Sequence, residues 1–88
     1  MVTWRLVFTS QARRDARRLA KSGLRPKAEL LLELLRKGPF QTSPRYQKLI
    51  GDLAGAYSRR INIQHRLVYQ VLPEIRTVKI IRMWTHYE

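Results

Sequence analysis

The chain has 88 residues, of which 44% are hydrophobic, which suits one small globular domain over residues 1–88 and excludes a disordered basic tail. It has 18 lysines and arginines against six acids, a net charge of +12, which favours a polyanionic or acidic partner. It has no cysteine, no metal-ligand spacing and no apolar run near the roughly 20 residues of a membrane span, so we expect a cytoplasmic protein without disulfide, metal or cofactor.

The first half of the chain predicts one strand followed by two helices. Residues 4–9 are rich in aromatic and β-branched side chains, as strands are. Ser10 is expected to cap the first helix, whose apolar residues recur at helical spacing as far as Gly23. Pro26 suits the first turn of a second, leucine-rich helix, which Gly38 and the following proline should end.

The second half predicts a loop and then three strands. Residues 41–55 carry the serine, proline and glycine signals of a loop, and the apolar period then becomes two over residues 57–63, 66–72 and 77–84. The short breaks between these runs imply antiparallel neighbours. The predicted fold is therefore α+β with the order β-α-α-β-β-β. Two helices pack on one face of a twisted, mainly antiparallel sheet, and the other face is partly open.

Two arginines are expected on the open face. Alternation along residues 57–63 directs Arg60 away from the helices, and on the next strand the apolar set that begins at Leu67 directs Arg66 away from them too. Two guanidinium groups on neighbouring strands can hold one phosphate and stabilise its developing charge. The plainer interpretation, that both are solvated cations of a very basic surface, is equally open.

The histidines and the first helix offer further candidates. His65 lies at a predicted hairpin turn, where a structural role is the more common one, whereas His86 and Tyr87 follow an apolar run that would fix them at the chain end. On the first helix, Arg14 and Arg18 are four residues apart and share a face. The basic ridge to which they belong favours contact with a phosphate backbone or an acidic partner over simple solvation.

Three segments resemble the Txe/YoeB family of bacterial toxins, within the RelE-like superfamily. They are Leu-Ala-Gly-Ala-Tyr-Ser-Arg-Arg-Ile at 53–61, His-Arg-Leu-Val-Tyr at 65–69 and Thr-His-Tyr at 85–87. The central motif is specific, whereas the N-terminal third is compatible only in pattern. The resemblance implies a RelE-like fold and a type II toxin–antitoxin toxin. Such a toxin is a metal-independent endoribonuclease (an mRNA interferase) that cuts mRNA in the ribosomal A site and inhibits translation.

The resemblance also implies roles for individual residues. The RNA 2′-hydroxyl attacks the adjacent phosphate, Arg66 stabilises the charge that develops there, and His86 is the general acid, with Tyr87 beside it. Arg60 is the supporting phosphate-binding arginine. RNA contacts are further expected from four other cations, Lys48, Arg59, Arg14 and Arg18.

One family residue does not carry over. The position of the general-base glutamate is held by Gln47, whose amide cannot accept a proton as a carboxylate does. Lost general-base catalysis typically costs about 10²–10⁴-fold in rate. The alternative is therefore a catalytically impaired module that binds RNA, the ribosome or an antitoxin. The implied partners are a YefM-like antitoxin, the ribosome and mRNA, and both a homodimer and a toxin–antitoxin hetero-oligomer are left open.

Overall fold

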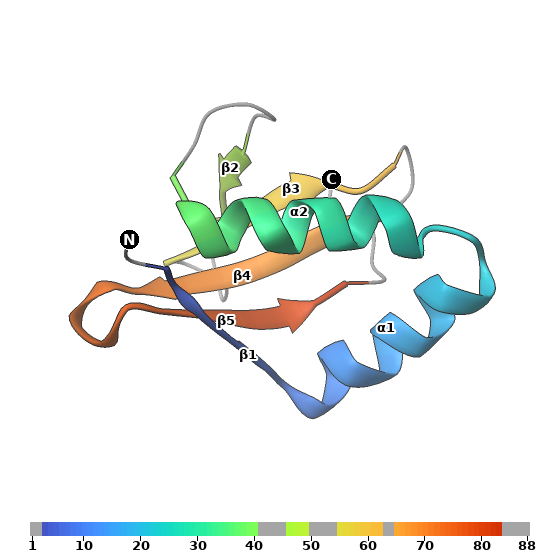
Figure 1. Ribbon diagram of the computed structural model, residues 1–88, viewed down its shortest axis with the longest axis horizontal. Helices are drawn as coiled ribbons and strands as arrows, with labels where there is room; N and C mark the ends of the chain where they lie inside the picture. The colour runs from blue at the N-terminus through green and yellow to red at the C-terminus, as the bar shows by residue number, and fades with distance from the viewer. Residues whose placement is uncertain (1–2, 41–45, 50–54, 63–64, 84–88) are drawn as a thin grey trace.

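Two helices pack on one face of a five-stranded mixed sheet (Figure 1), in a computed structural model that describes residues 3–40, 46–49, 55–62 and 65–83. The elements are β1 (Arg5–Phe8), α1 (Ser10–Lys21), α2 (Arg25–Lys37), β2 (Tyr46–Lys48), β3 (Ala56–Arg60), β4 (Arg66–Leu72), the 3₁₀ turn η2 (Pro73–Ile75) and β5 (Thr77–Arg82). The predicted α+β class, with both helices on one face of the sheet, is confirmed. Neither described helix is long and apolar enough to cross a membrane.

The strand order is β1-β5-β4-β3-β2. β1 runs parallel to β5, and every other neighbouring pair is antiparallel. The short connections predicted this for β3, β4 and β5. β2 is thus an edge strand that pairs with β3, and β3 and β4 form the hairpin that carries the central sequence motif. This edge of the sheet is the one that positions the candidate site.

Two local expectations are corrected by the structure. Residues 41–55 are not only a loop, because Tyr46–Lys48 pair with β3, and three residues among turn signals are too few to show a period of two. The cap of α1 is Thr9 and not Ser10. The Thr9 hydroxyl accepts a backbone N–H of the first helical turn at 3.0 Å and donates to the carbonyl of Ile81 at 2.9 Å.

The core lies between the helices and the sheet. Leu19 of α1 and Leu35 of α2 pack against side chains of β4 and β5 that are fully buried, namely Leu67, Tyr69, Val78 and Ile80. The other face of the sheet is less open than the sequence predicted, because its small and apolar side chains Ala56, Ser58 and Val68 are also buried. Polar side chains on that face therefore project from a packed surface.

A buried ion pair joins α1 to the end of β5. Asp15 is 0% exposed, and its Oδ2 accepts from Arg82 Nε and from the backbone N–H of Met83, each at 2.9 Å. The carboxylate thereby fixes the chain where it leaves β5. The sequence contained a signal for this contact, because Asp15 is an acid in the apolar stripe of α1 that includes Ala12 and Leu19.

Candidate active site

Three polar side chains from three neighbouring strands meet on the face away from the core. Gln47 of β2 lies directly opposite Ser58 of β3, and Arg66 of β4 reaches back across Ser58 from a position two residues along the ladder. The Arg66 Nη1 donates a hydrogen bond to Oε1 of Gln47 and lies 3.4 Å from Oγ of Ser58. The sequence predicted Gln47 and Arg66 as site residues, and the fold brings them into contact.

The electrostatics of this group suit an anion. Gln47 is exposed and Arg66 is half-buried, so part of Arg66 remains accessible to solvent. Neither the amide oxygen nor the hydroxyl that it meets is charged, so neither contact neutralises the cation. A guanidinium that is oriented by neutral acceptors can add a charge-assisted hydrogen bond to a phosphate.

Two other predicted cations at this edge of the sheet, Arg60 and Lys48, lie on opposite faces. Arg60 is exposed and lies directly opposite Arg66 in the register, so the expectation that the two share a face is confirmed. Arg60 also borders a hollow of about 410 Å³ beside Leu30 and Leu34 of α2. Lys48 is exposed too, but alternation along β2 places it on the opposite face from Gln47.

Arg59 has an internal place, which corrects the expectation that it contacts RNA. It is 0% exposed, its Nε donates to Oη of Tyr69 at 3.0 Å and its Nη2 donates to the carbonyl of Pro39 at 3.0 Å. A guanidinium buried in this way is not accessible to a polynucleotide. The same alternation that directs Arg60 away from the helices puts Arg59 on the helix-facing side with Tyr57, and this was the signal for burial.

The phenol of Tyr69 has a perturbed titration. Burial raises the pKa of Tyr69 above its usual value, and the hydrogen bond and positive charge of Arg59 oppose that rise. The hydroxyl therefore stays protonated at neutral pH and can donate as well as accept. It lies 3.5 Å from the same Pro39 carbonyl, so the phenol and the guanidinium share one acceptor.

The two histidines differ in what the structure says of them. His65 is 7% exposed, and its backbone closes the β3–β4 turn, with its N–H donating to Oδ1 of Asn62 at 2.7 Å and its carbonyl accepting from Ile61 at 2.8 Å. This placement favours the structural role expected for a turn histidine. His86 and Tyr87 lie outside the described residues, and their roles stay predictions.

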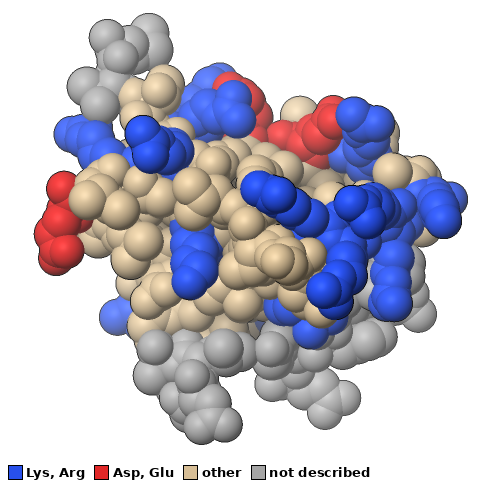
Figure 2. All heavy atoms as spheres, turned by 90° about the horizontal axis from the view of Figure 1, so that it is seen from below, with Lys and Arg blue, Asp and Glu red and all other residues tan. Residues whose placement is uncertain are grey.

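The predicted basic ridge is present on α1. Arg14 and Arg18 are both exposed, and the helix's other cations, Arg13, Arg17 and Lys21, are exposed as well. The single acid of α1, Asp15, is turned into the protein. Figure 2 shows lysine and arginine side chains gathered on the face seen from below, the side on which α1 lies in Figure 1. This surface presents cations without a compensating acid from the same helix.

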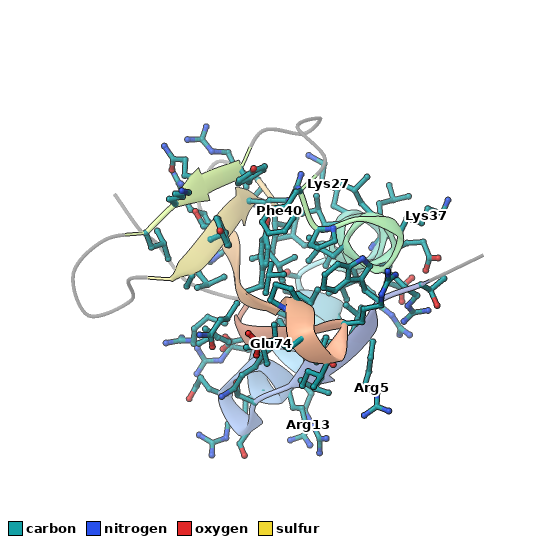
Figure 3. All side chains as sticks on the ribbon, turned by 90° about the vertical axis from the view of Figure 1, so that its left-hand side faces the viewer. Arg5, Arg13, Lys27, Lys37, Phe40 and Glu74 are labelled. Carbon is teal, nitrogen blue, oxygen red and sulfur yellow. The ribbon has the colours of Figure 1, made fainter. Side chains whose placement is uncertain are left out.

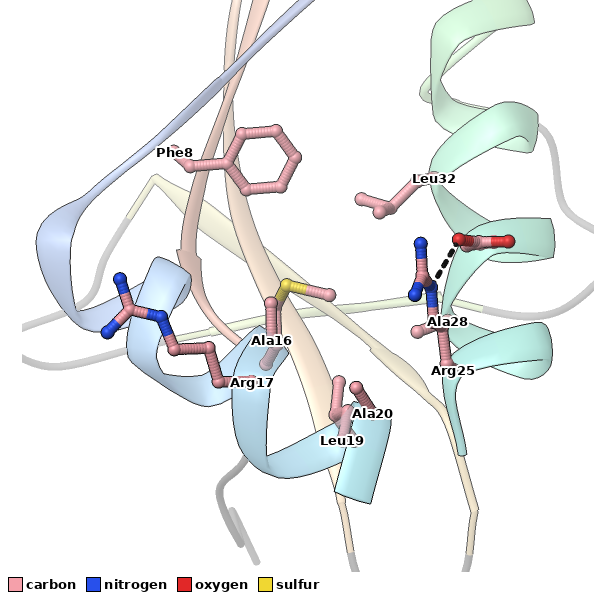
Figure 4. A pocket seen from close by; sticks show the side chains of 10 residues that line it. Phe8, Ala16, Arg17, Leu19, Ala20, Arg25, Ala28 and Leu32 are labelled. Atoms are coloured by element: carbon pink, nitrogen blue, oxygen red, sulfur yellow. Dashed lines mark hydrogen bonds and ion pairs between the residues drawn. The ribbon is translucent and has the colours of Figure 1, made fainter. Parts of the chain in front are cut away.

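An apolar hollow of about 350 Å³ separates α1 from α2 (Figure 4). Its apolar lining includes Phe8, Leu19, Leu32 and Met83. Arg17 borders it, as does the exposed Arg25–Glu29 ion pair, whose Nε–Oε1 distance is 2.8 Å. The hollow is apolar inside and charged at its border, which suits the docking of an apolar side chain. Among the residues that the structure describes, no group of histidine, aspartate and glutamate could hold a metal ion.

Comparisons with known proteins agree with the resemblance seen in the sequence. Residues 7–87 match the family model described as the YoeB-like toxin of the bacterial type II toxin–antitoxin system. Toxin YoeB of Streptomyces coelicolor is 33% identical over 85 residues, which cover 94% of this chain and 99% of that protein. Among solved structures, the YoeB/ParE toxin from Agrobacterium tumefaciens superposes with a TM-score of 0.85 at 29% identity, covering 94% of this chain and 99% of that one. A chain of the YoeB-YefM complex from Staphylococcus aureus gives a TM-score of 0.78 at 33% identity, covering 96% and 98%.

Proposed function

Because the chain belongs to the YoeB-like toxin family of bacterial type II toxin–antitoxin systems, we propose that it is an mRNA endonuclease that acts on the ribosome and inhibits translation. The observation that carries this proposal is the contact between Arg66 and Gln47. A guanidinium held by neutral acceptors contacts Gln47. The sequence resemblance puts Gln47 at the position of the family's general base. That pairing of a phosphate-binding cation with a proton-accepting position is what transfer within a phosphodiester requires.

The reaction is an internal attack. The 2′-oxygen of the RNA forms a bond to the adjacent phosphorus, the bond from phosphorus to the 5′-oxygen of the next nucleotide breaks, and the 2′-proton passes to solvent water. Arg66 stabilises the negative charge that develops on the phosphate oxygens, and Arg60 binds the phosphate from the neighbouring strand. His86 donates a proton to the departing 5′-oxygen, with Tyr87 beside it. None of these steps assigns a role to a metal ion.

Gln47 sets the rate of the proposed reaction. Its amide oxygen occupies the base position and accepts from Arg66, but it cannot take the 2′-proton at neutral pH. The ribosome must then supply substrate positioning that partly offsets the missing base, since orientation alone contributes substantially to catalysis. We therefore expect cleavage that depends on the ribosome and that is slower than it would be with a glutamate at position 47.

The test is primer extension on the same message, ribosome-bound and free, after incubation with the purified chain. The proposal predicts cuts within A-site codons of bound message and little cutting of free message. Equal and efficient cleavage of both would remove the ribosome dependence. No cleavage by this chain or by Gln47→Glu would leave only the alternative that the amide at position 47 keeps open, a module that binds without cleaving.

A second part of the proposal is the partner. The solved relative from Staphylococcus aureus is in complex with YefM, and we propose a YefM-like antitoxin for this chain. Its acidic segment would lie along the ridge of α1 and insert an apolar side chain into the hollow between α1 and α2, beside Arg17 and Arg25. Exposed ion pairs contribute only about 0–1 kcal/mol each, so the apolar anchor should supply much of the affinity.

Co-expression with a neighbouring gene that encodes a small acidic protein tests the partner. We expect the two proteins to elute together in size-exclusion chromatography and cleavage to stop in the complex. Separate elution, or a complex that still cuts, would count against the antitoxin. Leu32→Asp places a negative charge in the hollow and should weaken the complex, whereas Leu30→Asp, at a residue outside its lining and 72% exposed, serves as the matched control.

A further inference from the structure

We infer that Arg59 is a positioning residue, which holds the edge strand β2 on the sheet and thereby keeps Gln47 in contact with Arg66. The catalytic meaning of that contact rests on the proposed function. The effect of Arg59 on the position of β2 rests on the structure alone. Arg59 does not touch the site itself. It lies on the opposite face of β3 from Ser58, which borders the site.

The guanidinium of Arg59 joins segments on both sides of the α2–β2 connection. Nη2 donates to the carbonyl of Pro39, which follows α2, and Nε donates to Oη of Tyr69 on β4, each at 3.0 Å. Its central carbon lies 5.1 Å from the ring centroid of Tyr46, the first residue of β2 and the register partner of Arg59. The Arg59 guanidinium thus contacts Pro39 after α2, Tyr46 at the start of β2 and Tyr69 in the middle of the sheet.

Aromatic rings complete the attachment of β2. The ring of Tyr46 lies 5.5 Å from that of Tyr57 on β3, edge to face, and Phe40 packs on both at 6.3 and 5.6 Å. Figure 3 shows Phe40 between α2 and the strands β2 and β3. Edge-to-face pairs and cations over rings favour one geometry over others, so this cluster specifies where β2 lies as well as adding buried area.

The position of β2 decides the position of Gln47. β2 has only three residues, so its ladder to β3 is short, and Gln47 immediately follows Tyr46 on the other face of the strand. A shift of β2 by one residue would turn Gln47 away from Arg66 altogether. Arg59 therefore acts on the site through Tyr46, and a lysine, which lacks the planar fork, cannot make the same set of contacts.

The first experiment measures hydrogen exchange, which needs no activity. Arg59→Lys keeps the charge but replaces the two donor nitrogens Nε and Nη2 by a single one. We expect exchange at residues 46–48 to rise about tenfold or more, as removal of a buried charge-assisted hydrogen bond implies. Exchange in β5 should stay unchanged. The matched control is Arg76→Lys, which alters another arginine over an aromatic ring, 5.9 Å from that of Trp4, away from β2. Exchange at residues 46–48 that equals the control's overturns the inference.

The second experiment is a double-mutant cycle on the single-turnover cleavage rate at saturating ribosomes. In the Gln47→Glu chain, Arg59→Lys should lower the rate about tenfold with ribosome affinity unchanged. In the Gln47→Ala chain it should lower the rate no further, because no side chain is left to position. Equal decreases of the cleavage rate in both chains would contradict the inference, because Arg59 would then affect the rate independently of Gln47. If neither the Gln47→Glu chain nor the Gln47→Ala chain cleaves, the proposed function fails. The exchange experiment then still decides whether Arg59 holds β2 on the sheet.

A second variant covers the case in which Arg59→Lys does not fold. Tyr69→Phe removes one acceptor of the guanidinium but keeps the ring, whose stacking on Tyr57 at 5.9 Å does not need the hydroxyl. We expect the same increase in exchange at residues 46–48, smaller in size, together with the same dependence on Gln47. Unchanged exchange in Tyr69→Phe, in a chain that folds, would also contradict the inference.

Discussion

In the proposed reaction, the residue at position 47 determines whether the site contains a general base. The Gln47 oxygen already accepts from Arg66, and a glutamate of nearly the same shape would make the same contact as a charged pair. We predict that Gln47→Glu raises the single-turnover cleavage rate at least about tenfold, within the range of general-base catalysis, and leaves ribosome affinity nearly unchanged. Gln47→Ala is the control, because it removes the hydrogen bond to Arg66 without adding a base. A rate that does not rise would mean that residue 47 is not at the base position.

The buried phenol of Tyr69 gives a prediction in pH. Burial raises the pKa of Tyr69 in the folded chain, so above about pH 10 the unfolded chain loses this proton more readily than the folded one. The contribution of Tyr69 to the free energy of unfolding is therefore fully present below that pH and is lost as pH rises through the folded-state pKa. Tyr69→Phe should show a shallower decline in the free energy of unfolding between about pH 9 and pH 11. Parallel declines in urea titrations of the two chains would contradict this.

At the scale of residues, the sequence predicted part of the site. Alternation was enough to place Arg60 and Arg66 on one face, because the two strands that carry them are joined by a short turn. The contact of Arg66 with Gln47 could not be predicted, because it depends on a three-residue strand hidden among loop signals. Arg59 was assigned to RNA on charge, although its place in the alternation indicated burial. The chain-end residues His86 and Tyr87 lie outside the described part of the chain.

Among the elements, α1 and β5 depend on one buried carboxylate. Asp15→Ala would leave the Arg82 guanidinium and the Met83 N–H without this acceptor. Removing one partner of a buried ion pair typically costs about 3–5 kcal/mol, and because the Arg82 side chain is 32% exposed we expect about 3 kcal/mol. Urea unfolding measures the decrease in stability. Glu29→Ala is the control, since it breaks an exposed pair worth about 0–1 kcal/mol, and equal decreases in the two chains would contradict this role of Asp15.

The exposed ridge of α1 should act in binding and not in chemistry. Arg14→Gln and Arg18→Gln each remove one cation that no acid of the same helix offsets at the surface. We expect weaker ribosome binding and a salt slope that is smaller by about one for each phosphate that the variant no longer neutralises. The single-turnover rate at saturation should not change. A fall in that rate with unchanged affinity would place the ridge in the active site instead.

The elements themselves were largely predictable, for physical reasons that differ along the chain. Helical and strand periods are visible where one face of an element is more buried than the other, which holds for α1, α2, β4 and β5. The end of α1 was predicted because Gly23 adopts a φ of +82°, which only glycine takes up without strain. The parallel pairing of β1 with β5 could not be predicted from local patterns, because it joins opposite ends of the chain.

At the scale of the whole molecule, a net charge of +12 on a small domain implies long-range attraction to a polyanion such as the ribosome. That attraction explains encounter but not cleavage, because charge spread over a surface does not orient a phosphate. Orientation comes from the packed sheet edge, where three adjacent strands place Gln47, Ser58 and Arg66 together. The proposed function therefore depends on this group more than on the overall charge.

The most direct test is cleavage of a ribosome-bound message by the purified parent chain, Arg66→Ala and Arg5→Ala. Arg5 lies on β1, the edge strand farthest from β2, and is exposed, so its substitution removes the same charge away from the site (Figure 3). We predict cuts in A-site codons by the parent and by Arg5→Ala at similar rates, and none above background by Arg66→Ala. Cleavage by Arg66→Ala at the parent rate would contradict the account.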